Sequence, residues 1–287
     1  MVFKKLLRKI YSFSYGNVNK FRVAALLYIA NTLNVVGVKL VILSRKFVRA
    51  RLGRVQRDCV GWRIESLEKL HSSIKHEIKM QKKEFPHFLY FGGFPYQALD
   101  MVNIFGARPT EIRYAQYGLD DMIGKDDRIL DIGANCGFMV VYAAFRSGCR
   151  AVCIDHNQYM LNIGRHTAEY LGVEDNIEWS DARFQDFVPT EPFSVVFSFA
   201  AHWTDDEGYR VSLDTHLKRI HSMMAKNGVL VFESHTADIG NEQFYRDMKA
   251  MRHHYSWEGS KLLEDGTREL FIMRKLDLSS KKRRAIP

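Results

Sequence analysis

Apolar positions follow two different patterns along this 287-residue chain, and the change between them falls near residue 105. Before it, apolar residues from Ile64 to Ile78 recur every three or four positions, which predicts an amphipathic helix over about 62–83. After Pro109, short apolar runs alternate with longer helical patterns. Strands that alternate with helices are typical of an α/β domain with a largely parallel sheet.

The second pattern predicts each element in turn. Helices are expected over 110–122, 138–146, 158–171 and 211–225. Strands are expected at 128–133, 151–154, 176–179, 194–199 and 228–233. Near the end, Glu264, Asp265 and Gly266 separate two further apolar runs at 261–263 and 267–274, which indicates a hairpin. The sheet is therefore expected to close with an antiparallel pair.

Basic residues are concentrated at the two ends of the chain. Of the 42 Lys and Arg residues, thirteen lie in 1–57, which holds no Asp or Glu, and four lie at 281–284. The remainder, 58–280, holds 25 basic and 33 acidic residues, so this body is net −8 although the whole chain is formally +9. Because ordinary surface helices mix both signs of charge, a merely solvated face explains the N-terminal segment less well than an anionic partner does.

The N-terminal segment pairs its basic residues with apolar ones at helical spacing. Cationic amphipathic helices without acids suit the plane of an anionic membrane surface. Residues 23–43 are apolar enough to raise the question of a spanning helix, but the run is interrupted by Asn31, Thr32, Asn34, Gly37 and Lys39. Whether it spans or lies on the membrane stays open. Nucleic acid is a less favoured partner, because the aromatic residues of this segment accompany the leucines instead of the basic residues.

The four cysteines do not form a disulfide framework in a chain of this length. Cys149 and Cys153 lie four residues apart, but no second pair or histidine cluster completes a zinc site, so no metal is expected. No apolar segment with a small-residue cleavage site follows the N-terminus. The expectation is a protein with reduced thiols, located in the cytoplasm and peripheral or monotopic at the inner face of the membrane.

The strand expected at 128–133 leads into a turn that contains two glycines. Gly133 and Gly137 lie between a strand and a helix, where a residue without a Cβ lets the backbone approach a ligand closely. Asn135 occupies the middle position, so the turn reads Gly-x-x-x-Gly and lacks the full Gly-x-Gly-x-x-Gly fingerprint of dinucleotide-binding dehydrogenases. A nicotinamide-dependent enzyme is therefore the less favoured interpretation.

Acidic residues end this strand and the next two. Asp131 lies in the first, Asp155 ends the second, and Asp181, followed by Ala182, ends the third. With the glycine turn and the terminal hairpin, this set resembles the class I S-adenosylmethionine-dependent methyltransferases over about residues 110–276. The resemblance implies a Rossmann-like, doubly wound, mostly parallel seven-stranded sheet with an antiparallel terminal hairpin. It also implies S-adenosyl-L-methionine as the cofactor.

The same resemblance assigns roles to these residues. Asp131 would lie near the amino group of the methionine moiety, Asp155 would accept hydrogen bonds from both ribose hydroxyls, and Asp181 with the Ala182 backbone would contact the adenine edge. The expected cofactor-binding residues are Asp131, Gly133, Asn135, Gly137, Asp155, Asp181, Ala182 and Ser198.

The acceptor side of the site is expected beyond the carboxyl ends of the later strands. A hydroxyl acceptor loses its proton around the transition state of methyl transfer, so a base near neutral pKa helps. His202 is the first candidate for a catalytic residue and His235 the second, with packing or capping as the alternative for each. Residues 92–96 are expected to fold over the site as a lid. Three acids at 205–207 could join His202 around a metal, but a solvated loop is the simpler interpretation.

Four segments are therefore predicted: a basic helical membrane-associating extension (1–85), a linker or lid (86–108), a methyltransferase domain (109–276) and a basic tail (277–287). The expected function is methyl transfer at the cytoplasmic membrane surface, with O-methylation of a glycan or lipid-linked acceptor favoured. Two alternatives stay open: an RNA methyltransferase whose basic N-terminus binds the phosphate backbone, and a non-catalytic membrane adaptor that keeps the fold. The oligomeric state is not predicted.

Overall fold

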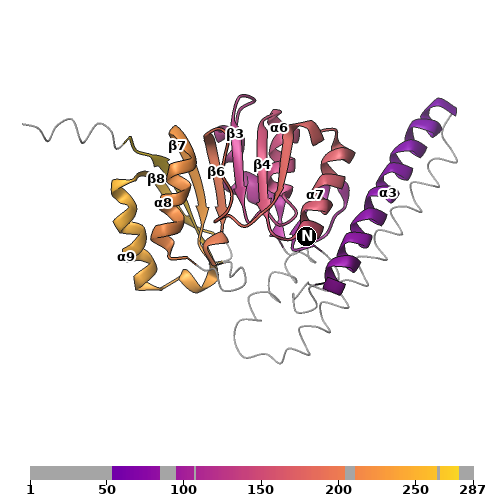
Figure 1. The fold of residues 1–287 in the computed structure, drawn as a ribbon. Helices are drawn as coiled ribbons and strands as arrows, with labels where there is room; N and C mark the ends of the chain where they lie inside the picture. Colours follow the sequence, from indigo (N-terminus) through magenta and orange to yellow (C-terminus); the bar gives the residue numbers. More distant parts are fainter. Residues whose placement is uncertain (1–53, 85–94, 107, 204–210, 264–265, 278–287) are drawn as a thin grey trace, which may run out of the picture.

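A seven-stranded sheet forms the centre of the structure, a computed structural model that describes residues 54–84, 95–106, 108–203, 211–263 and 266–277. The strand order is β5-β4-β3-β6-β7-β9-β8 (Figure 1). Neighbouring strands are parallel from β5 to β7, and β9 is antiparallel to both β7 and β8. The strands are β3 (Arg128–Ile132), β4 (Arg150–Asp155), β5 (Ile177–Asp181), β6 (Phe193–Phe199), β7 (Met224–Glu233), β8 (Tyr255–Leu262) and β9 (Glu269–Lys275).

Helices pack on both faces of this sheet and make a three-layer domain. Side chains of α4, α6 and α7 belong to the core cluster on one face, and those of α8 and α9 belong to the cluster on the other. A separate pair of short parallel strands, β1 (Gln97–Ala98) and β2 (Arg108–Pro109), precedes α4. The helices are α3 (Arg54–Glu84), α4 (Thr110–Gln116), α5 (Leu119–Met122), α6 (Phe138–Ser147), α7 (Gln158–Leu171), α8 (Leu213–Met223) and α9 (Glu242–Ala250).

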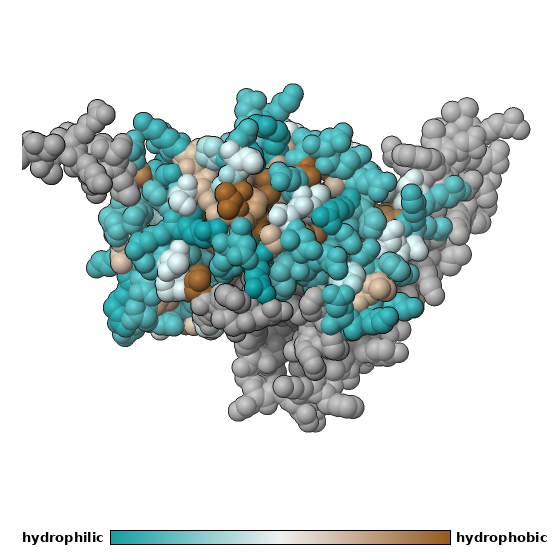
Figure 2. Space-filling model, in the orientation of Figure 1, coloured by the Kyte–Doolittle hydropathy of each residue, from teal (hydrophilic) through white to brown (hydrophobic). Residues whose placement is uncertain are grey.

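The central strands are mostly apolar because helices cover both of their faces. In β3, Ile129 packs in one core cluster and Leu130 in the other, so both orientations of the strand are buried. Asp131 is the polar residue in the buried part of this strand, and it is 2% exposed. The outer surface is different: the face drawn in Figure 2 is mostly hydrophilic, with a small hydrophobic group near its middle.

The predicted fold class is confirmed, including the antiparallel terminal hairpin. The helix expected over 158–171 is α7, and the one expected over 62–83 lies within α3. The single helix expected over 110–122 is wrong, because Gly118, at φ +66°, separates α4 from α5. The helix expected to continue to residue 225 ends at Met223, and β7 begins at the next residue. Helix α9 was not anticipated.

Helix α3 packs along α7 through one apolar face. Leu70, Ile74 and Ile78 are buried on this face. Within the contact, the Asn162 amide of α7 donates to Glu77 Oε2 (3.1 Å). Among the described helices, none combines the length and hydropathy that a bilayer-spanning helix needs. Residues 1–53, on which the membrane prediction rests, lie outside the described residues, and the four-segment division of the chain stays a prediction.

Candidate active site

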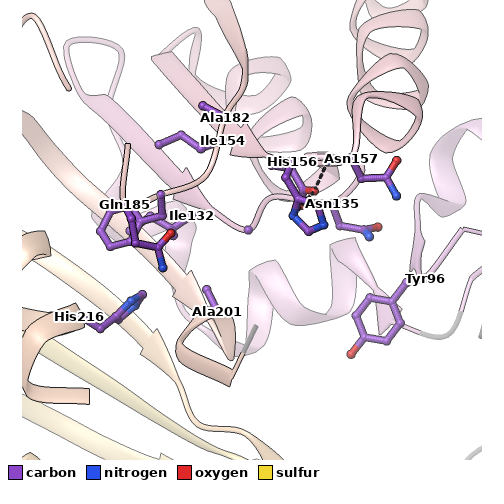
Figure 3. Close-up of a pocket in the computed structure, with 13 residues that line it drawn as sticks. Tyr96, Ile132, Asn135, Ile154, His156, Asn157, Ala182, Gln185, Ala201 and His216 are labelled. Carbon is purple, nitrogen blue, oxygen red and sulfur yellow. Dashed lines mark hydrogen bonds and ion pairs between the residues drawn. The ribbon is translucent and has the colours of Figure 1, made fainter. Parts of the chain in front are cut away.

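A cleft of about 180 Å³ opens at the carboxyl edge of the sheet, where β3, β4 and β5 end. One end of the cleft is formed by Ile132, Gln185 and His216, and Tyr96 lies at the other end (Figure 3). The loops after β3 and β4 form the part between them. The complete lining is Tyr96, Ile132, Gly133, Asn135, Ile154, Asp155, His156, Asn157, Ala182, Phe184, Gln185, Ala201 and His216.

The glycine turn has the backbone geometry that its sequence predicted. Gly133 has φ +64°, and a Cβ there would lie 3.3 Å from the Ala201 Cβ across the cleft. Asn135 also has positive φ (54°), which asparagine tolerates better than most residues. Gly137 has φ +62°, but a Cβ there would meet the Trp179 ring at 2.8 Å. The second glycine therefore serves packing beneath the turn and does not line the cleft.

Asp155 holds the turn in place with both carboxylate oxygens. Its Oδ2 accepts a hydrogen bond from the Asn135 backbone N–H (2.7 Å), and its Oδ1 accepts one from the Asn157 N–H (2.9 Å). Asn157 in turn is the N-cap of α7, where its side chain accepts from the Met160 N–H. Asp155 thus connects the β3 turn with the start of α7 and still lines the cleft.

A buried glutamine from β1 supports the same turn from the other side. Gln97 Nε2 donates to the Ala134 carbonyl (2.9 Å), and its Oε1 accepts from the Phe138 N–H (3.0 Å). Both ends of the turn are therefore bonded to one side chain that lies almost forty positions earlier in the sequence. Sequence reasoning missed Gln97, because nothing local marks a glutamine as the partner of a distant backbone.

Asp131 lies beneath the turn with an unsatisfied oxygen. Its Oδ2 is buried and has no hydrogen-bond partner. Burial raises the pKa of this carboxyl to about 8, the Arg113 guanidinium opposes the rise, and Asp155 adds to it. The side-chain oxygen of Asn135 is also buried without a partner. The turn thus presents two acceptor oxygens that a hydrogen-bond donor on a ligand would satisfy.

The end of the cleft near β5 combines predicted and unpredicted residues. Asp181 and Asp155 are paired in the sheet register, but Asp181 is exposed and only the adjacent Ala182 lines the cleft. Ser198 is fully buried below the cleft, and its Oγ is hydrogen-bonded to His216 Nε2 (3.0 Å). Burial, with a further contribution from His202, lowers the pKa of His216 to about 3, so this cleft residue is a neutral imidazole at physiological pH.

His202 lies behind the cleft lining, in a cluster of aromatic side chains, with its ring centroid 6.2 Å from that of the cleft residue His216. Its Nε2 donates to Asp238 Oδ2 (2.9 Å), and its ring centroid is 4.9 Å from that of Phe232. Trp203 Nε1 donates to the other oxygen of Asp238 (2.7 Å). Burial alone would raise the pKa of Asp238, but the hydrogen bond and charge of His202 hold it below its ordinary value.

His235 caps the short helical turn that follows β7. Its Nδ1 accepts from the Ala237 N–H (3.1 Å), and its ring stacks on Trp203 with centroids 4.8 Å apart. Neither His202 nor His235 lines the cleft described above. Their catalytic roles stay predictions, as do the acids at 205–207 and the part of the lid at 92–94, which lie outside the described residues.

A second polar cluster surrounds Glu233 at the end of β7. Arg108 Nη2 and Arg268 Nη1 donate to its Oε1 (2.8 and 2.5 Å), and Arg113 Nη2 donates to its Oε2 (2.9 Å). Tyr117 also hydrogen-bonds Oε2. Burial alone would raise the pKa of Glu233, but the three arginines hold it well below its ordinary value. Arg268 connects this cluster with the cleft, because its Nη2 donates to the Tyr96 hydroxyl (3.1 Å).

Comparison with known families identifies this part of the chain. Residues 129–228, from β3 into β7, match the family model of the methyltransferase domain. These residues carry a methyltransferase domain. The predictions of family, enzyme class and S-adenosyl-L-methionine as cofactor are confirmed with it.

Several solved structures are similar in fold to the methyltransferase chain. The E. coli protein YJHP is 18% identical, with 53% of this chain and 67% of that chain covered and a TM-score of 0.44. A SAM-dependent methyltransferase from Thiobacillus denitrificans, in complex with S-adenosyl-L-homocysteine, is 17% identical, with 53% and 66% covered and a TM-score of 0.45. The N-methyltransferase NodS from Bradyrhizobium japonicum is 17% identical, with 58% and 96% covered and a TM-score of 0.46. The chain thus covers about two thirds of the length of the E. coli and Thiobacillus denitrificans proteins. No curated protein matches the sequence.

The residues of the methyltransferase cleft fit the cofactor on their own chemistry. The buried Asp131 oxygen provides an acceptor for an ammonium group, and the missing Cβ at Gly133 leaves the turn open toward the cleft. Gly133, Asn135, Asp155 and Ala182 line one cleft, whereas Asp131 and Ser198 are buried, Gly137 packs on Trp179, and Asp181 is exposed. The role of each residue toward the cofactor stays a prediction.

Proposed function

We propose that this methyltransferase transfers the methyl group of S-adenosyl-L-methionine to a hydroxyl of a glycan or lipid-linked acceptor at the cytoplasmic surface of a membrane. One observation carries the location. Residues 1–57 hold thirteen basic residues and no acid, whereas 58–280 is net −8. An acidic catalytic body with a basic extension fits attachment of the extension to anionic lipid headgroups.

The acceptor follows from this location. An enzyme held at a membrane surface encounters acceptors that are themselves lipid-linked or assembled there. Methyl transfer from a sulfonium is an in-line displacement in which positioning of the two reactants supplies much of the rate. In this proposal the turn around Gly133 and Asp155 holds the cofactor. The segments after β6 and β7, which carry His202 and His235, are proposed to face the acceptor.

A labelling experiment tests the acceptor class. The protein and tritiated S-adenosyl-L-methionine are added to fractionated cell extract, and label is measured in the lipid, glycan, RNA and protein fractions. Label in lipid or glycan supports the proposal, and label confined to RNA supports an RNA methyltransferase. If calorimetry detects no binding of the cofactor to the wild-type protein, a non-catalytic adaptor is favoured instead.

Vesicle binding tests the location separately. Full-length protein is sedimented with phosphatidylcholine vesicles with and without phosphatidylserine, beside a variant with Lys4, Lys5, Arg8 and Lys9 changed to Gln. Each basic residue near an anionic surface contributes about 1 kcal/mol, so the variant is expected to bind anionic vesicles several-hundredfold more weakly. Equal binding of both proteins to neutral and anionic vesicles would contradict an electrostatic attachment.

A further inference from the structure

The face of α3 that points away from α7 carries a row of lysines. Lys69, Lys75, Lys79, Lys82 and Lys83 are all exposed, while Leu70, Ile74 and Ile78 are buried on the opposite face. Their spacings of six, four, three and one positions keep the five lysines within an arc of about 140° on one side of the helix. At 1.5 Å per residue the row is about 21 Å long. Figure 1 shows α3 at the flank of the domain, outside α7.

Glu65 and Glu68 lie on this face just before Lys69, but between Lys69 and Lys83 no acidic residue on this face balances the lysines. Glu77 is the only acid between Lys69 and Lys83 in the sequence. It is turned to the α7 side, where it accepts from Asn162 and lies 3.5 Å from His166 Nε2. Lys75 and Lys79, and again Lys79 and Lys83, stand four positions apart, a spacing at which like charges destabilise a helix. Favourable interaction with the helix dipole accounts for Lys82 and Lys83 in the last turn, but not for the others.

We propose that this lysine face binds the anionic headgroups of a phospholipid bilayer and orients the methyltransferase domain on the membrane. The inference rests on the membrane location proposed above and adds a second, structured contact to it. The acid-free basic segment 1–57 runs directly into α3, which begins at Arg54. The row is longer than the screening length of physiological salt, about 8 Å, so each lysine interacts mainly with the headgroups next to it, and only an extended anionic surface can contact all five.

The lysine face also lies close to the cleft. Glu84, at the end of α3, is hydrogen-bonded to the Tyr159 hydroxyl in the first turn of α7. Asn157, the N-cap of α7, lines the cleft. The lysines at the end of α3 are therefore near the entrance side of the site. A bilayer that contacts them would hold headgroup-level acceptors next to the cleft.

The test uses the full-length chain with Lys75, Lys79 and Lys82 changed to Gln, a residue with good helix propensity. Its control has three exposed lysines elsewhere, Lys125, Lys249 and Lys261, changed to Gln, so both variants lose the same charge. Binding to phosphatidylcholine vesicles with and without phosphatidylserine is measured by sedimentation. The α3 variant is expected to bind anionic vesicles roughly a hundredfold more weakly than wild type, and the control within a fewfold. Calorimetry should give both variants the wild-type cofactor affinity.

Three results would overturn the lysine face as a lipid contact. Wild-type binding by the α3 variant, or an equal loss in the control, would show that this face makes no specific contribution although the membrane location stands. Loss of RNA retention in the α3 variant with vesicle binding unchanged would assign the face to nucleic acid. Absence of vesicle binding by wild type itself would remove the proposed membrane location together with this inference.

Discussion

Asp131 and Glu233 are both buried carboxylates near the carboxyl edge of the same sheet, but their surroundings are opposite. Glu233 accepts from three guanidinium groups and a phenol, and its pKa is held well below the ordinary value. Asp131 has a buried oxygen with no partner, and its pKa is raised to about 8. A buried carboxylate whose hydrogen bonds are all satisfied by the protein has a structural role. A buried carboxylate with an unsatisfied oxygen gains a hydrogen bond when a ligand binds, so it is the stronger candidate for a binding residue.

The largest effect is expected when the charge of Glu233 is removed. Glu233→Gln leaves three arginines around a neutral side chain, and removing one partner of a buried ionic network typically costs about 3–5 kcal/mol. Urea denaturation measures the loss. The control is Glu191→Gln, because Glu191 is 60% exposed at 3.7 Å from Arg128, and such surface pairs contribute less than about 1 kcal/mol. Equal small losses in both variants would contradict a framework role for Glu233.

The pH dependence of this contribution has a definite sign. The pKa of Glu233 is lower in the folded protein than its ordinary value of 4.5. Its stabilisation is therefore fully present above about pH 4.5 and is lost as the pH falls toward the folded value. The difference in unfolding free energy between wild type and Glu233→Gln should shrink in acid.

Asp131→Asn is expected to have the opposite effect on stability. With its pKa raised to about 8 by burial, Asp131 destabilises the folded protein increasingly as the pH rises from its unfolded pKa of about 4 toward 8, by up to about 1.4 kcal/mol per pH unit. The asparagine variant should therefore be more stable than wild type at about pH 7, and the difference should fade near pH 4. A pH-independent difference in urea denaturation would count against a protonated Asp131.

The same variant separates stability from cofactor binding. If Asp131 receives the cofactor's ammonium group, Asp131→Asn should weaken the affinity by about a hundredfold or more, as expected for a charge-assisted bond in a buried site. Because the ammonium group favours the ionised carboxylate, wild-type affinity should rise with pH up to about 8. Binding at neutral pH should release protons, which calorimetry in buffers of different ionisation enthalpy detects. Tight binding by the variant would exclude this role.

The sequence predicted the part of the site that is local in the chain. Gly133 and Asn135 lie in the turn after one short apolar strand and Asp155 ends the next, and the sheet register brings the ends of these strands together without further information. The order of strands and helices was predictable for the same reason, since the period of the apolar pattern changes with each element. Gly118 shows the limit of this reasoning. The helical pattern of apolar residues continues through 110–122, but the backbone leaves the helical conformation at Gly118.

The distant partners could not be predicted in this way. Glu233 is 125 positions from Arg108, 120 from Arg113 and 35 from Arg268. Nothing at those positions distinguishes these arginines from surface residues until the fold brings them together. His216 is similar, because it lies on a helix with ordinary amphipathic spacing and reaches the cleft only because α8 packs beside β6. The arrangement of elements, and not any motif, selects these residues.

Asp155 and Asp181 extend the comparison to a smaller effect. The two are register neighbours, but only Asp155 lines the cleft and bonds two backbone N–H groups. Asp155→Ala removes both bonds. Because a buried polar group left without a partner costs roughly 1–3 kcal/mol, the variant should bind the cofactor about 10- to 100-fold more weakly. Asp181→Ala, at an exposed position, should change it by less than about tenfold. The contrast fails if calorimetry gives the two variants the same affinity.

The smallest effect is expected at His235, whose capping bond is exposed, and the buried His202 provides the larger effect for comparison. His235→Ala loses one exposed capping bond to the Ala237 N–H and should cost about 1 kcal/mol or less. His202→Asn removes a buried bond to Asp238 and should cost about 1.5–3 kcal/mol. If either histidine is catalytic, its variant slows turnover at unchanged cofactor affinity, and the slowing persists at temperatures where the protein is fully folded. Turnover that recovers as the temperature is lowered would instead leave His202, through Asp238 and Trp203, as a residue that holds the loop after β6.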